Sequence, residues 1–450
     1  MTNQYSKDIW HPFSHPTAVD AQIDPIHIVS ADGVYVKDDQ GRELLDGTAG
    51  GLWCVNVGQS RPEMKKAITN QLDEMAFYHM FGGASHPRST ELAAKLVNMA
   101  KPENMKRVFF TSGGSDSVEN ALKIARQYHV LNGEPDRKKF ISLKCSYHGT
   151  HFGGTSLHGG DKGGVRRNYE PLLGGCIKVE APWLYRNPWH CDDPEQLVDS
   201  CINQLIAEIE FNASDTIAAL IAEPVMGGSL IIPPESYWPR LREVCDQYGI
   251  LLIADEVITG FGRSGCLFGS RGWGVAPDIM TLAKGISSGY IPLGAVMINE
   301  RIEQAWETNN DARGFISSGI TYSGHPVACA AGLAALDIVE KENLPKNAKI
   351  QGDYLLEKLK PFAEKFPSVG DVRGKGLMLG LELVADKKTR QPVDVAKGLA
   401  LNIAAAARKH GALVRPAGQR ILLAPHLIYT TSHCDQLVDA LSKAFNEIDR

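Results

Sequence analysis

Five short apolar runs in this chain are each followed, within three residues, by residues that can do chemistry. The runs cover residues 107–111, 140–143, 217–222, 250–254 and 279–283. The segments that follow them are Ser112-Gly113-Gly114-Ser115-Asp116, Ser146-Tyr147-His148-Gly149-Thr150, Glu223-Pro224, Asp255-Glu256-Val257 and Lys284-Gly285. In an open parallel sheet, ligands bind beyond the carboxyl ends of the strands. One sheet edge would then hold a Gly/Ser turn, an aromatic ring, two carboxylates and a lysine, which suit a flat, cationic, phosphorylated cofactor.

Asp255 and Lys284 are the central pair of this set. A carboxylate buried at a strand end is costly unless it meets a positive partner, and the protonated ring nitrogen of pyridoxal 5′-phosphate is such a partner. A lysine can hold the aldehyde of the same cofactor as an imine and later carry protons between carbon atoms. A structural Asp–Lys ion pair is the alternative, but the neighbouring strand ends favour the cofactor. We therefore expect pyridoxal 5′-phosphate, with Lys284 and Asp255 as the catalytic residues.

The Ser112–Asp116 turn leads from a predicted strand into a predicted helix. Free N–H groups and the helix dipole favour a phosphate dianion at such a turn. Gly113 and Gly114 let the backbone approach closely, and Ser115 adds a hydroxyl. The alternative is a plain helix N-cap without a ligand.

Three further strand-end residues could complete a cofactor site. Tyr147 and Val257 could cover the two faces of a ring, and Glu223 could accept a hydrogen bond behind it. The alternatives are a tyrosine in the core and a carboxylate on a solvated loop.

The elements that position these residues follow from the hydrophobic pattern. The five apolar runs lack period-2 alternation, as do strands buried on both faces. In Val118–His129, apolar residues recur at helical spacing, so strands and helices alternate and predict an α/β fold with a mostly parallel sheet between helices. The last third predicts a long helix over 326–340, a helix near 346–366, and strands around 368–384 and 412–425. It also predicts a helix between those strands and a final helix after Ser432.

This pattern predicts a large domain and a smaller α+β domain. We expect residues 1–60 to be the N-terminal part of the small domain, 61–325 the large cofactor-binding domain, and 326–450 the C-terminal part of the small domain. The chain of 450 residues is long enough for both.

Composition argues against several other classes of protein. The net charge of −5 argues against a nucleic-acid partner, which usually needs a basic face. The nine cysteines include no C-x-x-C pair, so we expect free thiols in a reducing compartment and no metal site. The chain shows neither an apolar signal segment nor a long uncharged apolar run, so we expect a cytoplasmic protein without a membrane partner.

At these residues the sequence resembles the class III aminotransferases, the ω-transaminases of the fold-type I pyridoxal-phosphate superfamily. The stretch LLIADEVITGFGRSG at 251–265, followed by Ala283-Lys284-Gly285, is similar to the cofactor signature of that family. Further similar pieces are GLWC at 51–54, YHG at 147–149, AEP at 222–224 and TYSGHP at 321–326. The segment 325–344 is most similar to β-alanine:pyruvate transaminases.

The resemblance implies a role for each matching residue. It makes Lys284 the imine-forming lysine, pairs Asp255 with the ring nitrogen and places substrate in an apolar pocket with a mobile arginine. The implied cofactor contacts are Gly114, Ser115, Tyr147, His148, Glu223, Asp255, Val257, Lys284 and Thr321, with Thr321 reaching the neighbouring subunit of a homodimer or a dimer of dimers. The implied substrate contacts are Phe13, Trp53, Phe81 from the partner chain, Tyr147, and Arg415, which would grip the carboxylate of a keto acid. The alternative for Arg415 is a surface arginine, with Arg420 as a competitor for its role.

The resemblance also implies the reaction, a ping-pong transfer of an amino group from an ω-amino acid or amine to pyruvate. Two positions depart from the family pattern: Asp116 stands where glutamate is usual, and Ile320 where an aromatic is usual, which leaves the substrate preference open. Other pyridoxal-phosphate chemistry (decarboxylation, epimerisation or an aminomutase reaction) and a 2-oxoglutarate-dependent transfer are the enzymatic alternatives. A cofactor-binding transcriptional regulator, which would add a DNA-binding helix-turn-helix segment, is disfavoured because the part before the catalytic pattern near residue 50 is short and Pro-rich and the net charge is acidic. The donor amine and the choice between dimer and tetramer stay open.

Overall fold

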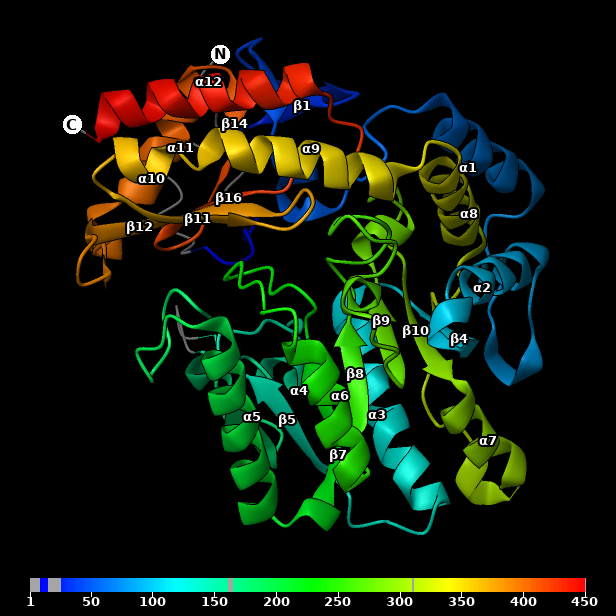
Figure 1. Cartoon of the computed structure of the whole chain (residues 1–450). Coiled ribbons are helices and arrows are strands. Elements are labelled where there is room, and N and C mark those ends of the chain that lie inside the picture. Colours follow the sequence, from blue (N-terminus) through cyan, green and yellow to red (C-terminus); the bar gives the residue numbers. More distant parts are fainter. Residues whose placement is uncertain (1–8, 15–25, 161–164, 310, 450) are drawn as a thin grey trace.

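The computed structural model describes residues 9–14, 26–160, 165–309 and 311–449. In Figure 1 a sheet flanked by helices forms the lower part, and the strand β1 (Ile28–Asp32) and the helix α12 (Thr431–Ile448) lie in the upper part. No helix within the described ranges is long and apolar enough to cross a membrane.

The central sheet has the strand order β4-β10-β9-β8-β7-β5-β6. Its strands are β4 (Met105–Thr111), β5 (Lys139–Leu143), β6 (Cys176–Val179), β7 (Ile217–Ala222), β8 (Leu251–Asp255), β9 (Ile279–Leu282) and β10 (Gly294–Asn299). Neighbours from β6 to β9 are parallel, while β10 is antiparallel to both β9 and β4. Strand β4 therefore runs in the same direction as β9, and its carboxyl end lies at the same edge of the sheet as the other predicted strand ends.

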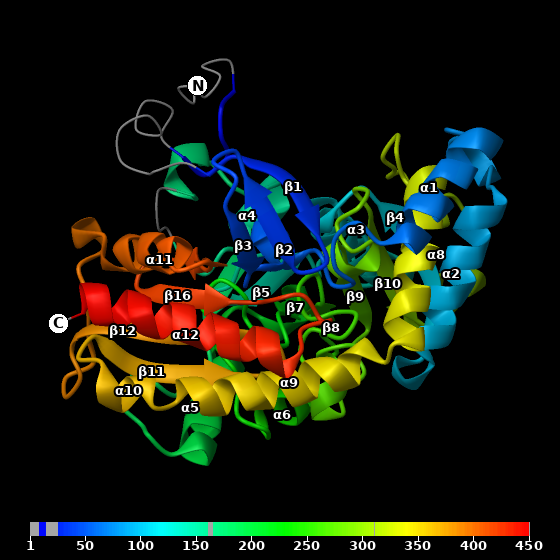
Figure 2. The ribbon, with the colours of Figure 1, turned by 90° about the horizontal axis from the view of Figure 1, so that it is seen from above.

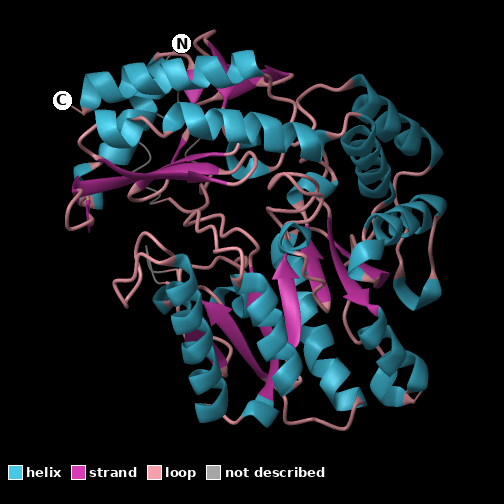
Figure 3. Ribbon diagram, in the orientation of Figure 1, coloured by secondary structure: helices cyan, strands magenta, loops and turns pink. Residues whose placement is uncertain are grey.

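Helices cover both faces of this sheet (Figure 3). They are α3 (Gly114–Leu131), α4 (Phe152–Ser156), α5 (Pro194–Phe211), α6 (Tyr237–Tyr248) and α7 (Glu300–Thr308). Successive strand residues pack into different cores: Leu220 lies in the cluster with α5 and α6, and Ile221 in the cluster with α3. Both faces are buried, which explains why the strands read as continuous apolar runs. The predicted α/β class is confirmed.

A second group of helices lies beside the β4 end of the sheet. Helices α1 (Pro62–Glu74) and α2 (Pro87–Met99) both contact α8 (Pro326–Lys341), and α2 also contacts β4. Helix α8 begins at a proline, as predicted, because a proline in the first turn loses no intrahelical hydrogen bond.

The C-terminal part combines antiparallel strands with helices. The strands are β11 (Val369–Gly374), β12 (Leu379–Asp386), β13 (Gln391–Pro392), β15 (Arg415–Pro416) and β16 (Arg420–Leu423). The helices are α9 (Leu344–Leu359), α10 (Phe362–Lys365), α11 (Leu399–Lys409) and α12 (Thr431–Ile448). The predicted helix near 346–366 is thus two helices, which are separated by Lys360 and Pro361.

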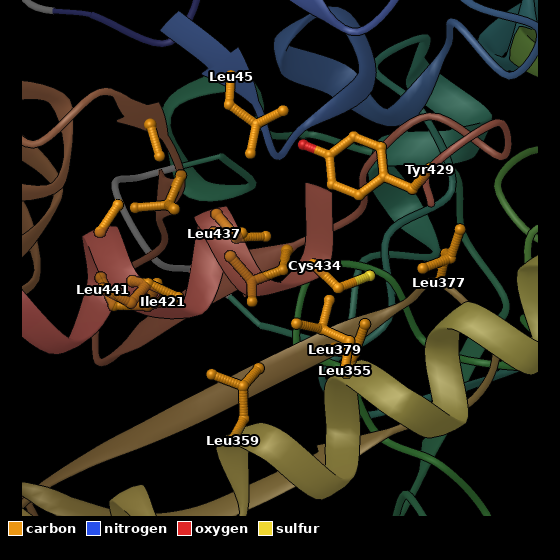
Figure 4. Close-up of a cluster of buried hydrophobic side chains, with 14 of the residues drawn as sticks. Leu45, Leu355, Leu359, Leu377, Leu379, Ile421, Tyr429, Cys434, Leu437 and Leu441 are labelled. Atoms are coloured by element: carbon orange, nitrogen blue, oxygen red, sulfur yellow. The ribbon is translucent and has the colours of Figure 1, made fainter. Parts of the chain in front are cut away.

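The N-terminal strands join this C-terminal part. Strands β1 (Ile28–Asp32), β2 (Tyr35–Asp38) and β3 (Glu43–Asp46) form a sheet with β14 (Ala412–Leu413), and β3 pairs with β14 in parallel. Figure 2 shows these strands beside α11 and α12. Figure 4 shows Leu45 of β3 in one apolar cluster with Leu437 and Leu441 of α12. The boundaries of the two domains stay a prediction.

Candidate active site

A cavity of about 140 Å³ lies at the carboxyl edge of the central sheet. Its lining residues follow β4, β5, β7, β8 and β9, so the structure brings together residues from all five predicted strand ends. They are Gly114, Ser115, Val118, Tyr147, His148, Gly149, Glu223, Asp255, Val257, Ile258, Ala283 and Lys284.

Lys284 follows β9 and lies deep in the protein, with some exposed surface where it lines the cavity. Burial lowers its pKa, and the positive charge of Arg415 acts in the same direction, while Cys54, Asp255 and Glu223 partly oppose the shift. No carboxylate of the described residues forms an ion pair with its amine. The backbone at Lys284 is left-handed, with φ of 45°, which is a strained conformation for a residue with a side chain. The amine is therefore held at the cavity in a state that favours its neutral, nucleophilic form.

Asp255 is the last residue of β8 and is almost fully buried. Its Oδ2 lies 2.7 Å from Nδ1 of His148, and its Oδ1 accepts hydrogen bonds from Thr281 Oγ1 at 3.0 Å and Val257 N at 3.2 Å. Nδ1 of His148 donates here, because an ionised carboxylate only accepts. These contacts fix the orientation of the Asp255 carboxylate at the cavity.

The turn after β4 leaves the first turn of α3 without a side-chain cap. The N-cap residue is Gly113, and no side chain accepts from the first N–H groups. A side chain at Gly114 would place Cβ 2.9 Å from Cγ1 of Val257, so glycine is needed for the helix to approach the cavity this closely. The alternative of a plain N-cap loses support, because the hydroxyl of Ser112 is buried without a partner and does not cap the helix. Free N–H groups at a helix N-terminus suit a phosphate.

Asp116, one of the two departures from the family pattern, makes local contacts. Its Oδ2 accepts a hydrogen bond from Ser112 N at 3.2 Å, and its Oδ1 lies 3.3 Å from His151 Nε2. The shorter carboxylate thus braces the turn that carries Gly114.

Glu223 holds two loops at the back of the cavity. Its carboxylate is buried and accepts from Tyr147 N at 3.0 Å and Gly227 N at 2.8 Å. Glu223 is therefore not a carboxylate on a solvated loop, which was the alternative to a role at the cofactor site. Tyr147 is 36% exposed and lines the cavity, so it is not a core tyrosine.

The burial of Glu223 predicts a pH effect on stability. Burial raises the pKa of Glu223 to about 7 from 4.5, and Asp255 adds to the shift while His148 and the two N–H donors oppose it. The folded chain therefore binds a proton that the unfolded chain releases, so the stability from this group is full below pH 4.5 and is lost as the pH rises through about 7. Glu223→Gln should remove this loss, which is on the order of 3 kcal/mol. Urea unfolding of the cofactor-free proteins across this range measures it, and parallel pH profiles for variant and wild type would contradict it.

Arg415 begins β15 and is half-buried near Tyr147 and Lys284. Its Nη1 donates to the carbonyl of Gly51 at 3.0 Å, and none of the described acidic residues pairs with it. Burial lowers its pKa. Arg420, by contrast, is buried and paired with Glu382 at 2.9 Å, so its guanidinium is already occupied.

The segment before Cys54 presents the Gly51 carbonyl to Arg415. Asp46 accepts hydrogen bonds from the N–H groups of Thr48 and Gly50 at 2.8 and 2.6 Å. Ala49, Gly50, Gly51 and Trp53 all have positive φ angles. Trp53 is buried and packs close to Gly227, rather than lining the cavity.

Besides Trp53 and Arg415, three predicted site residues do not line this cavity. Phe13 is 73% exposed, Phe81 is 51% exposed, and Thr321 is exposed as well. Phe81 lines a second, apolar hollow of about 870 Å³ together with Phe109, Phe315 and others. Their predicted roles, two of which require a second subunit, stay predictions.

Two contacts were not predicted from the sequence. The pairing of His148 with Asp255 joins residues 107 positions apart, and Thr281 meets Asp255 because β8 and β9 align these two residues. The only sequence signal for Thr281 is a polar residue inside an apolar run that directly precedes Lys284.

The comparisons with known proteins agree with one another. A family model described as aminotransferase class-III matches residues 17–445. Gamma-aminobutyrate transaminase 1, mitochondrial, of Oryza sativa subsp. indica is 37% identical over 423 residues, which cover 94% of this chain and 81% of that protein. Putrescine–pyruvate aminotransferase of Pseudomonas aeruginosa is 37% identical over 425 residues, which cover 93% of this chain and 90% of that protein. The PLP-bound structure of an amine transaminase from an uncultivated Pseudomonas species has a TM-score of 0.96 and 53% identity, with 99% of each chain covered.

Proposed function

The chain belongs to the class III aminotransferases, which use pyridoxal phosphate, and on that premise we propose that it moves an amino group from an ω-amino acid or another primary amine to pyruvate. The observation that carries the proposal is the cavity at the sheet edge. It combines a lysine of lowered pKa with a fixed buried carboxylate and an uncapped helix N-terminus. The guanidinium of Arg415 lies near it, and none of the described carboxylates pairs with that guanidinium.

The residues of the cavity fit the cofactor. The first turn of α3 at Gly114 and Ser115 suits the phosphate, and the buried carboxylate of Asp255 suits a protonated ring nitrogen. Lys284 suits the aldehyde, because none of the described carboxylates forms an ion pair that would keep its amine protonated. Tyr147 and Val257 are proposed to cover the two faces of the ring.

The proposed chemistry follows from these positions. When bound, pyridoxal phosphate supplies an electron-withdrawing ring that takes up the charge left at the donor carbon after deprotonation. Nζ of Lys284 would take the proton from that carbon and deliver it to C4′ of the cofactor. The carboxylate of Asp255 would keep a proton on the ring nitrogen, while His148 and Thr281 hold its two oxygens. Glu223 holds the backbone of Tyr147 in place behind the ring.

Arg415 is proposed to bind the carboxylate of the keto acid. Its guanidinium makes a single hydrogen bond, to the uncharged carbonyl of Gly51. A carboxylate would instead accept two charge-assisted hydrogen bonds in the plane of the guanidinium. The guanidinium can therefore leave Gly51 when pyruvate enters and return when an uncharged amine donor occupies the pocket.

Arg415→Ala tests this role of the arginine. We expect kcat/KM for pyruvate to fall roughly 10- to 100-fold, because a hydrogen-bonded charge pair is lost. A neutral aldehyde acceptor should lose far less, and Arg415→Lys, which keeps the charge without the planar fork, should lie between. Equal losses for pyruvate and the aldehyde would refute the carboxylate role.

A donor panel tests the proposed function as a whole. β-Alanine, 4-aminobutyrate, a diamine and a simple amine are each combined with pyruvate, and the alanine formed is measured. Alanine from at least one of them supports the proposal. Transfer from glutamate, with no alanine from the panel, would instead indicate a 2-oxoglutarate enzyme.

A homodimer is proposed as the active unit. Phe81, Phe315 and Tyr322 are large apolar or aromatic side chains that are 51, 74 and 60% exposed. They surround the segment that contains Thr321, and such a patch is typical of a protein interface. The patch supports roles for Thr321 and Phe81 at the site of a partner subunit. We also propose that the protein is located in the cytoplasm.

A further inference from the structure

A buried histidine lies directly behind the cavity without lining it. His158 is 5% exposed, and its Nε2 is 2.8 Å from the carbonyl oxygen of Gly149. Its ring meets the ring of Tyr147 edge to face, with centroids 4.8 Å apart and an angle of 86° between the planes. His158 thus contacts two residues that do line the cavity.

The backbone around His158 is fixed to the end of β5. The carbonyl of Leu157 accepts from the hydroxyls of Ser142 and Ser146, at 3.0 and 3.1 Å. The backbone of Gly159 exchanges hydrogen bonds with Cys145 and Ser146 at 3.1 Å each. A side chain at Gly159 would place Cβ 2.1 Å from Cys145 N, so only glycine permits this approach. The position of the imidazole is therefore set by the sheet itself.

The imidazole is held in one protonation state. Burial lowers the pKa of His158, and its neighbours His148, Lys178 and Arg166 act in the same direction, opposed by the Gly149 contact. A neutral imidazole has one N–H, and because a carbonyl only accepts, that hydrogen is on Nε2. His158 is thus a rigid neutral donor to Gly149 with its ring edge against Tyr147.

His158 contacts Tyr147 and Gly149, and residues 147–149 face three parts of the cavity. Tyr147 lines it, His148 bonds to Asp255, and Gly149 lies against Ser115 at the start of α3. The contact at Gly149 is close, because an added Cβ would be 2.6 Å from Ser115 Oγ, and the same hydroxyl accepts from Thr150 N at 3.0 Å. A shift of Gly149 would therefore move both Tyr147, which faces the place of the cofactor ring, and Ser115, which faces the place of its phosphate.

We propose that His158 is a positioning residue for the cofactor. It fixes the orientation of the Tyr147 ring and the position of the Gly149 carbonyl, so that residues 147–149 keep their contacts along the cofactor. This inference rests on the proposed stacking role of Tyr147. It is independent of the donor and the acceptor, because its readout is retention of the cofactor and not turnover.

Three variants of the holoenzyme separate the two contacts of His158. His158→Ala removes both, His158→Phe keeps a ring edge against Tyr147, and His158→Gln keeps a donor for Gly149. Each contact is worth roughly 0.7 kcal/mol, so we expect the alanine variant to lose cofactor on dilution about 10-fold faster than wild type, and the other two about 3-fold faster. The visible circular dichroism of the bound cofactor should change in His158→Ala and His158→Phe, where the backbone is released.

His129→Gln is the matched control. His129 is also buried and bonds to a carbonyl, that of Ala218 at 2.9 Å, but it lies in the last turn of α3, far from the cavity. Its variant should lower the Tm while leaving cofactor release and circular dichroism as in wild type. If His158→Ala fails to fold, the phenylalanine and glutamine variants carry the test. Wild-type release rates and spectra in the His158 variants that fold would overturn the proposal.

Discussion

Lys284→Ala is expected to abolish amino transfer from every donor, with a loss in kcat of roughly 10⁴-fold or more. No other described cavity residue has an amine, so nothing else there can both hold the cofactor aldehyde and return a proton to carbon. The absorbance of the lysine-bound cofactor, expected at roughly 400–430 nm, should disappear in the same variant. Steady-state rates with an amine and pyruvate, together with the visible spectrum, measure both effects.

Lys178→Ala is the control for this variant, because Lys178 is a second partly buried lysine. Burial lowers the pKa of Lys178 to about 8, and its amine donates to Ser142 Oγ at 2.7 Å and to the Ser156 carbonyl at 2.9 Å. It does not line the cavity. Its loss should reduce stability and leave the visible band in place. Turnover that persists in Lys284→Ala would refute the assignment of Lys284.

The fold could be predicted because its strands are buried on both faces. The run at 217–222 coincides with β7, the run at 250–254 is shifted from β8 by one residue, and the run at 279–283 is one residue longer than β9. Such strands combine continuous apolar runs with polar residues at their carboxyl ends. Since parallel strands share an edge, the sequence alone brings Asp255, Tyr147 and Lys284 to one place.

The details of the site depend on side-chain directions and on strand register, which no local pattern encodes. Tyr147 and His148 follow the same apolar run, yet their rings point to different partners. The ring of Tyr147 packs against His158, whereas the ring of His148 bonds to Asp255. The brace at His158 requires the 157–159 segment to fold back on the end of β5, which no periodicity indicates. The pairing of β3 with β14 joins strands more than 360 positions apart, and the roles of Thr321 and Phe81 depend on a second chain.

Asp255→Asn is expected to lower kcat by roughly 10²- to 10³-fold while the cofactor stays bound. Asparagine has the same shape and can still accept from Thr281, but it carries no charge and cannot keep a proton on the ring nitrogen. The cofactor should therefore be retained within a few-fold of wild type, whereas deprotonation of the donor carbon becomes slow. Single-turnover rates with an amine donor and the rate of cofactor release measure the two effects separately.

The matched control is Asp278→Asn, because Asp278 is another buried aspartate next to β9. Its carboxylate pairs with Arg242 at 2.8 Å and accepts from Leu252 N at 2.8 Å, and it does not line the cavity. Breaking this pair should lower the Tm and leave kcat of the folded holoenzyme near that of wild type. A loss in kcat of less than about tenfold in Asp255→Asn would mean that the charge of Asp255 is not what activates the cofactor. The hydrogen bonds from His148 and Thr281 would then hold a structural carboxylate, and the electron demand of the reaction would have to be met by the other groups at the cavity.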